Sequence, residues 1–266
     1  MSRVTSKDGT SIAYERAGSG PAVILVGGGV VDRSENAPLA PELARNFTAY
    51  NYDRRGRGDS GDTLPYALER ELEDIETLVR EAGGSAHLYG ISSGGALALE
   101  AAAAGITIDK VAVYEVPYNM AEDWPRRWRK YVEELGALLA TGRRGDAFAL
   151  FMRTADSSEE TIASARSSPM WPDLEAIAHT LAYDAACLGD GQPPAARFAR
   201  IGQATLVATG TGGRLPEAPS WVRALDPAAD AIAASIPHAE RLTIEGQGHV
   251  VDPKALAAVL EAFFGD

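Results

Sequence analysis

A serine enclosed by glycines is the first place where this sequence could do chemistry. Ser92 lies in "GISSG" (90–94), between the apolar run "AHLYGIS" (86–92) and the alanine-rich run "GGALALEAAAAG" (94–105). The first run is typical of a buried strand and the second of a helix, which places the serine on a sharp turn. Such a turn presents the hydroxyl as a nucleophile. The next N–H group, that of Ser93, then lies at a helix N-terminus, where it can stabilise developing negative charge.

The elements around this turn alternate in type along the chain. Short apolar runs alternate with longer helical patterns, which indicates an α/β fold with a mostly parallel sheet and crossover helices. We expect strands at 10–18, 22–29, 47–53, 86–92, 109–117, 204–210 and 239–246. We expect helices at 67–82 and 94–105 and from Pro253 onward.

One long segment breaks the alternation. Three helical patterns, at 120–142, 145–155 and 173–189, follow one another with no clear strand between them. A helical block between two sheet strands is typical of a lid over one end of the sheet. The sequence therefore predicts a core formed by 1–118 and 201–266, with a helical lid at 119–200.

Four landmarks in this order carry a family resemblance. They are "LVGGG" (25–29), "YDRRGRGDSG" (52–61), "YGISSGG" (89–95) and "EGQGHVVDP" (245–253). With them the chain resembles an α/β-hydrolase fold enzyme over essentially its whole length. The turn after the fourth strand is interpreted as bracing neighbouring loops, through Asp53, Arg54 and Arg55.

The resemblance implies roles for residues at three of these landmarks. Ser92 is the expected nucleophile, and His249, which lies between the last strand and the last helix, is the expected general base. The N–H groups of Ser93 and of Gly29, or else Gly28, are the expected oxyanion hole. The sequence lacks the histidine that usually begins the loop containing these glycines.

The third member of the triad departs from the common pattern. The usual aspartate would follow the strand at 204–210, but that region contains only one acid, Glu217. Glu115 is the alternative, at the end of the strand after the elbow helix, where some members of the superfamily carry their acid. A single glutamate inside "VAVYEVP" needs a partner if it is buried, which favours Glu115.

These residues predict a serine hydrolase that cleaves a carboxylic ester, lactone or related acyl bond of a small, largely apolar substrate. The reaction would pass through an acyl-enzyme on Ser92. The acyl pocket is expected in the lid, with four candidate lining residues: Trp124, Trp128, Met152 and Trp171. A ligand-binding protein on a hydrolase scaffold, and a lyase or perhydrolase that uses the same site, remain as alternatives.

Composition restricts the partners. The chain has 25 Lys+Arg against 37 Asp+Glu, a formal net charge of −12, which disfavours nucleic acid. No apolar run approaches the roughly 18 residues of a membrane span. The single cysteine, Cys187, and the absence of a signal-like N-terminus favour a reduced, cytoplasmic protein. We expect a monomer or homodimer that acts on a small molecule, with no cofactor and no metal.

Overall fold

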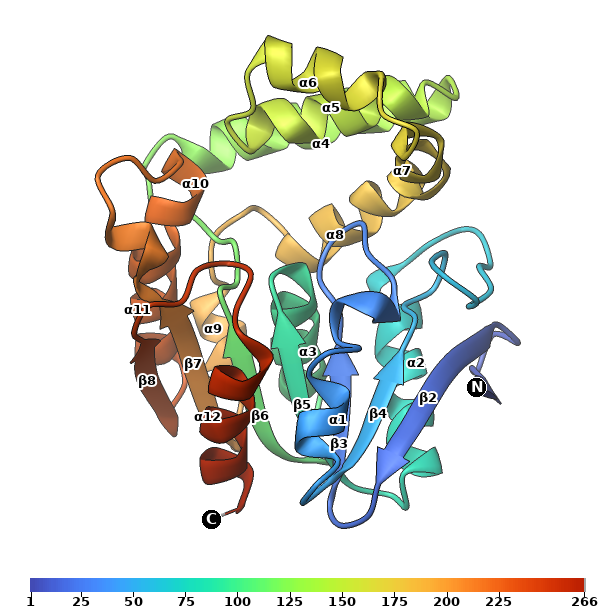
Figure 1. The fold of residues 1–266 in the computed structure, drawn as a ribbon, viewed down its shortest axis with the longest axis vertical. Helices are drawn as coiled ribbons and strands as arrows, with labels where there is room; N and C mark the ends of the chain where they lie inside the picture. The colour runs from blue at the N-terminus through green and yellow to red at the C-terminus, as the bar shows by residue number, and fades with distance from the viewer. Residues whose placement is uncertain (266) are drawn as a thin grey trace.

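An eight-stranded sheet forms the centre of the computed structural model, which describes residues 1–265 (Figure 1). The strand order is β1-β2-β4-β3-β5-β6-β7-β8; β2 pairs antiparallel with β1 and β4, and all other pairs are parallel. The strands are β1 Ser2–Thr5, β2 Ser11–Gly18, β3 Ala22–Val26, β4 Thr48–Tyr52, β5 Ala86–Ile91, β6 Ile108–Tyr114, β7 Ala204–Gly210 and β8 Ala239–Ile244. The predicted mostly parallel sheet is confirmed, and β1 adds a hairpin that the sequence did not indicate.

Helices cover both faces of this sheet (Figure 1). Those before β6 are η1 Arg33–Glu35, α1 Ala40–Leu43, α2 Leu68–Glu81 and α3 Ser93–Ala103. Those between β6 and β7 are α4 Trp124–Ala140, α5 Arg144–Thr154, α6 Glu159–Arg166, α7 Trp171–Ile177, η2 Ala178–Thr180, α8 Leu181–Leu188 and α9 Ala195–Phe198. Those after β7 are η3 Thr211–Arg214, α10 Ser220–Arg223, α11 Leu225–Ser235 and α12 Pro253–Gly265.

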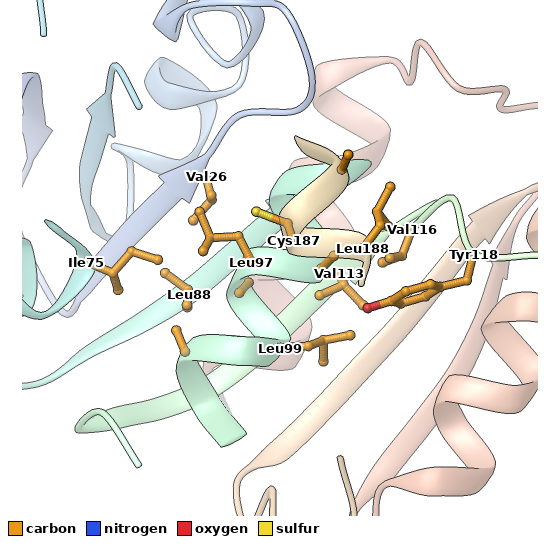
Figure 2. Close-up of a cluster of buried hydrophobic side chains, with 14 of the residues drawn as sticks. Val26, Ile75, Leu88, Leu97, Leu99, Val113, Val116, Tyr118, Cys187 and Leu188 are labelled. Atoms are coloured by element: carbon orange, nitrogen blue, oxygen red, sulfur yellow. The ribbon is translucent and has the colours of Figure 1, made fainter. Parts of the chain in front are cut away.

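Two apolar layers hold these helices to the sheet. Val26, Leu88 and Val113 belong to the layer shared with α2, α3, α8 and α11 (Figure 2). Their neighbours Leu25 and Tyr89 belong to the other layer, which contains α1 and α12. Because side chains alternate along a strand, a run that is apolar at every position is buried on both faces. This burial fixes the carboxyl ends of β3, β5 and β6 side by side.

The segment between β6 and β7 contains more helices than the sequence patterns predicted. Helix α6 was missed because only Ile162 of it is buried; its start is stabilised by the Ser158 side chain, which accepts a hydrogen bond from the Thr161 N–H. The predicted helix at 173–189 is instead α7, η2 and α8. The Thr180 hydroxyl donates to the Ile177 carbonyl at this break. Figure 1 shows α4, α5 and α6 lying above the carboxyl ends of the strands.

Close backbone contact at the start of α3 explains the glycines around Ser92. A Cβ on Gly94 would lie 2.3 Å from the Gly27 carbonyl oxygen, and a Cβ on Gly90 would lie 2.4 Å from the Gly94 oxygen. These neighbours are backbone atoms that cannot rotate away. The glycines therefore allow strand, helix and the loop after β3 to meet at one point.

Replacing Gly94 with alanine should lower the free energy of unfolding by at least about 2 kcal/mol, because the added methyl group must displace the loop after β3. Gly136 is the matched control. It is exposed in α4, and a Cβ there has no neighbour within 4 Å. Gly136→Ala should raise stability by about 0.5–1 kcal/mol. Urea unfolding of both variants checks the pair; equal shifts would contradict the steric argument.

Candidate active site

Ser92 occupies a strained turn between β5 and α3. Its backbone has φ 54° and ψ −130°, a region that residues with a side chain rarely adopt. Its N–H donates to the Tyr114 carbonyl oxygen at 2.9 Å, which ties the turn to the end of β6. Val30 and Glu115, which follow β3 and β6, also have positive φ values, of 49° each. Strain is thus concentrated at neighbouring strand ends, as is common at functional sites.

A histidine and a buried glutamate meet beside this turn. The Nδ1 atom of His249 lies 2.8 Å from Oε2 of Glu115, whose side chain is 1% exposed. The other oxygen of Glu115 accepts a hydrogen bond from the Gly210 N–H at 2.9 Å. Because Nδ1 faces the carboxylate, Nε2 of the imidazole remains available to another partner. The carboxylate can therefore orient the ring and stabilise its protonated form.

Tyr114 connects the histidine loop to the serine turn. Its hydroxyl donates to the Gly248 carbonyl at 2.7 Å, while its own carbonyl accepts the Ser92 N–H. Within residues 1–265 no hydrogen bond joins the Ser92 hydroxyl directly to His249. Contacts of this kind are often long before substrate binds. The Trp221 and His249 rings pack perpendicular to one another, with 4.9 Å between the ring centroids.

The two acids considered in the sequence differ in their contact with His249. Glu115 contacts His249, whereas Glu217 is exposed in the loop after η3 and makes no ion pair with that histidine in the described chain. Glu115 can reach the imidazole because β6 lies between β5, which carries Ser92, and β7.

The backbone N–H groups near Ser92 differ in whether they already donate a hydrogen bond to a protein acceptor. The Gly28 N–H donates to Oε2 of Glu35 at 2.6 Å. By contrast, neither the Gly29 nor the Ser93 N–H donates to a protein acceptor anywhere in the part of the chain described. Two free N–H groups at the ends of β3 and β5 can stabilise negative charge on a substrate oxygen.

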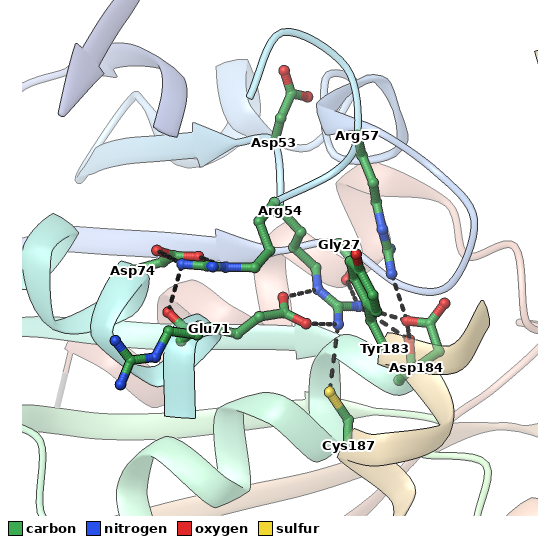
Figure 3. A network of polar contacts seen from close by, with 12 residues as sticks. Gly27, Asp53, Arg54, Arg57, Glu71, Asp74, Tyr183, Asp184 and Cys187 are labelled. Atoms are coloured by element: carbon green, nitrogen blue, oxygen red, sulfur yellow. Dashed lines mark hydrogen bonds and ion pairs between the residues drawn. The ribbon is translucent and has the colours of Figure 1, made fainter. Parts of the chain in front are cut away.

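Buried ion pairs lie under the loop after β3 (Figure 3). Arg54 donates to both oxygens of Glu71, at 2.7 and 2.8 Å, and to Asp184 at 2.8 Å. Arg57 donates to the same Asp184 oxygen at 2.7 Å. Burial alone would raise the pKa of Asp184, but the two guanidinium groups hold this pKa below its usual value. Arg55 pairs with Asp74, so the predicted bracing role of this turn agrees with the structure.

Comparison with known proteins places the chain in a family. The model of the Alpha/beta hydrolase family matches residues 23–261. The chain belongs to this family. The hydrolase is 47% identical to an alpha/beta hydrolase from Sphaerobacter thermophilus, with a TM-score of 0.85 over 99% of this chain and 100% of that one. It is 31% identical to a pimeloyl-[acyl-carrier protein] methyl ester esterase from Xanthomonas campestris pv. campestris, over 87% of this chain and 89% of the relative.

A further structural similarity concerns the fold alone. The enol-lactonase from Burkholderia xenovorans LB400 is 24% identical and superposes with a TM-score of 0.68, covering 100% of both chains. Across residues 1–265 of the hydrolase, no helix has the length and apolar character required to cross a bilayer.

The four lid residues expected to line a pocket fall into two groups. Trp124 lines a cleft of about 310 Å³ that also contains Trp221, and with Trp128 it lines a second cleft of about 230 Å³. Met152 and Trp171 instead pack among the helices of the insertion, where Trp171 donates to Glu175 at 2.7 Å. Of the four, only Trp124 shares a cleft with Trp221, the residue whose ring packs against His249.

Sequence reasoning missed three side chains at the site of this hydrolase. Asp184 is a single acid in the apolar run "LAYDAACL". The same kind of signal indicated Glu115, so the sequence could also have indicated Asp184. Trp221 and Glu35 had no such signal. Each lies on a short helix, and only the tertiary fold brings them to His249 and Gly28.

Proposed function

We propose that the protein is a serine hydrolase of carboxylic esters or lactones, with Ser92, His249 and Glu115 as its catalytic triad. The observation that carries this proposal is the 2.8 Å contact between Glu115 and Nδ1 of His249, at the end of the strand beside the Ser92 turn. A ligand-binding protein has no need of a buried carboxylate that orients a histidine.

The reaction follows from these positions. Nε2 of His249 removes the proton from the Ser92 hydroxyl, whose oxygen attacks the acyl carbon. The carbonyl oxygen becomes negative and accepts hydrogen bonds from the Ser93 and Gly29 N–H groups. Collapse of this intermediate expels the alcohol, which receives the proton from the imidazolium, and leaves an ester on Ser92. Water, deprotonated by His249, then attacks the acyl carbon; the bond from that carbon to the Ser92 oxygen breaks, the imidazolium returns its proton to Ser92, and the acid leaves.

Two observations support an ester or lactone of modest size as substrate. The cleft of about 310 Å³ is lined by Trp124 and by Trp221, whose ring packs against His249, and these aromatic rings suit an apolar acyl or alcohol group. The Xanthomonas relative acts on a methyl ester, so an ester bond lies within the chemistry of a 31% identical protein.

Treatment with a fluorophosphonate tests the proposal. An activated serine should displace fluoride and gain one phosphonyl group, which peptide mass spectrometry should locate on Ser92 of the folded protein. The same preparation should hydrolyse p-nitrophenyl acetate or butyrate, and the adduct should abolish that activity. Urea-unfolded protein is the control and should not react. Absence of both adduct and hydrolysis from folded protein would favour the ligand-binding alternative.

A further inference from the structure

The loop after β3 is held by charged side chains that the triad does not use. Three successive glycines form this loop, and the middle one is bound on both sides. The Gly28 N–H donates to the Glu35 carboxylate at 2.6 Å. The Gly28 carbonyl accepts hydrogen bonds from Arg57 and, at 3.3 Å, from Arg54. A negative group therefore contacts one peptide unit of the loop, and positive groups contact the next.

Because the peptide unit is planar, these contacts also determine where the Gly29 N–H points. The Gly28 carbonyl and the Gly29 N–H belong to the same trans peptide, so they point in opposite directions. The carbonyl points toward the guanidinium groups, so the Gly29 N–H points away from them. A Cβ on Gly28 would lie 3.2 Å from Cβ of Ser92, which places this peptide directly beside the nucleophile.

Burial makes both contacts strong. Arg57 is 2% exposed, and its charge is balanced by Asp184 of α8. Glu35 is half-buried and reaches back across the loop, so that its carboxyl accepts the Gly28 N–H. A charged group in a desolvated place binds a peptide dipole more tightly than it would in water. The loop is thus fixed before substrate arrives, which is how oxyanion holes avoid a reorganisation cost.

We propose that Glu35 and Arg57 are positioning residues that hold Gly28 from its two sides, so that the Gly29 N–H completes the oxyanion hole. This inference rests on the proposed function. It assigns the Gly28 N–H to Glu35 and removes it from the set of oxyanion donors. It also links the hole to the helical insertion, because Asp184 holds Arg57 in place.

The test separates stabilisation of the tetrahedral state from substrate binding. Four variants are compared with wild type: Glu35→Leu, Glu35→Gln, Arg57→Met and Arg57→Lys. For each, kcat and KM for p-nitrophenyl acetate and the inhibition constant of an alkyl boronic acid are measured. The boronate forms a tetrahedral adduct on serine with an oxygen in the hole, so its affinity reports the hole directly.

We expect Glu35→Leu and Arg57→Met to lower kcat by about 10²- to 10³-fold and to weaken the boronate by a similar factor. KM should change far less, since the ground state uses the hole weakly. Glu35→Gln keeps an oxygen that accepts the Gly28 N–H and should restore most of kcat. Arg57→Lys keeps the charge but loses the planar donor set, and should fall between Arg57→Met and wild type.

Arg45 provides the matched control, because it is exposed in the turn after α1 and, within residues 1–265, forms an ion pair only with Glu42. Arg45→Met should leave both kcat and boronate affinity unchanged. If Arg57→Met does not fold, the half-buried Glu35 pair decides the question. Wild-type boronate affinity in a folded Glu35→Leu variant would overturn the proposal. That result differs from failure of the proposed function, in which wild type itself would neither hydrolyse the ester nor react with a fluorophosphonate.

Discussion

Replacing Glu115 with glutamine should lower kcat for ester hydrolysis by about 10⁴-fold, the usual cost of losing a triad acid while the geometry stays intact. The Glu115 side chain is 1% exposed and its carboxylate is bound to Nδ1 of His249, so its charge is almost unscreened. An amide of the same shape cannot offset the positive charge that forms on the ring. It can also donate to Nδ1, which would place the imidazole proton on Nε2 and block removal of the serine proton.

Two further variants test whether Glu115, and not Glu217, is the triad acid. Glu217→Gln should leave kcat unchanged, because that residue is exposed and does not contact the histidine in residues 1–265. Glu115→Asp keeps the charge but withdraws the carboxylate by about one C–C bond, and should give an intermediate kcat. Steady-state kinetics on purified, folded proteins provide the measurement. A large loss with Glu217→Gln and none with Glu115→Gln would reassign the acid.

Local sequence signals predicted the parts of this site that depend on spacing or on a single unusual residue. The Ser92 turn is encoded by glycines that permit contact between a strand and a helix, so its place could be read from five residues. Glu115 was indicated by one acid among apolar neighbours. The alternation of apolar runs and amphipathic segments was likewise sufficient for the mostly parallel sheet.

The features that sequence reasoning missed depend on contacts between distant segments. The sequence left both Gly28 and Gly29 open as the oxyanion donor, because it does not show that the Glu35 side chain accepts the Gly28 N–H. The pairing of Arg57 with Asp184 spans 127 positions and requires α8 to pack against α3. Strand β1 and helix α6 were missed for a different reason: both are short and largely exposed, so neither has a clear apolar period.

The largest effect on stability should come from Glu71, whose removal leaves Arg54 short of its main partner. Glu71 is 1% exposed and accepts two hydrogen bonds from the guanidinium. Burial alone would lower the pKa of Arg54, yet Glu71 and Asp184 raise it well above its usual value, so this arginine stays charged. Glu71→Leu should therefore lower the free energy of unfolding by about 3–5 kcal/mol, as expected for a buried ion pair that loses one member.

Two comparisons show whether the charge left behind causes this loss. Glu76 lies on the same helix and pairs with Lys7 at the surface, where its side chain is 41% exposed. Glu76→Leu should cost less than about 1 kcal/mol, because water already solvates both partners. The double variant Arg54→Met/Glu71→Leu removes the buried charge together with its partner. It should recover most of the stability lost in Glu71→Leu, since an apolar pair of similar volume replaces the ions. Urea unfolding measures all three variants. A double variant no more stable than Glu71→Leu would mean that Glu71 acts through packing and not through Arg54.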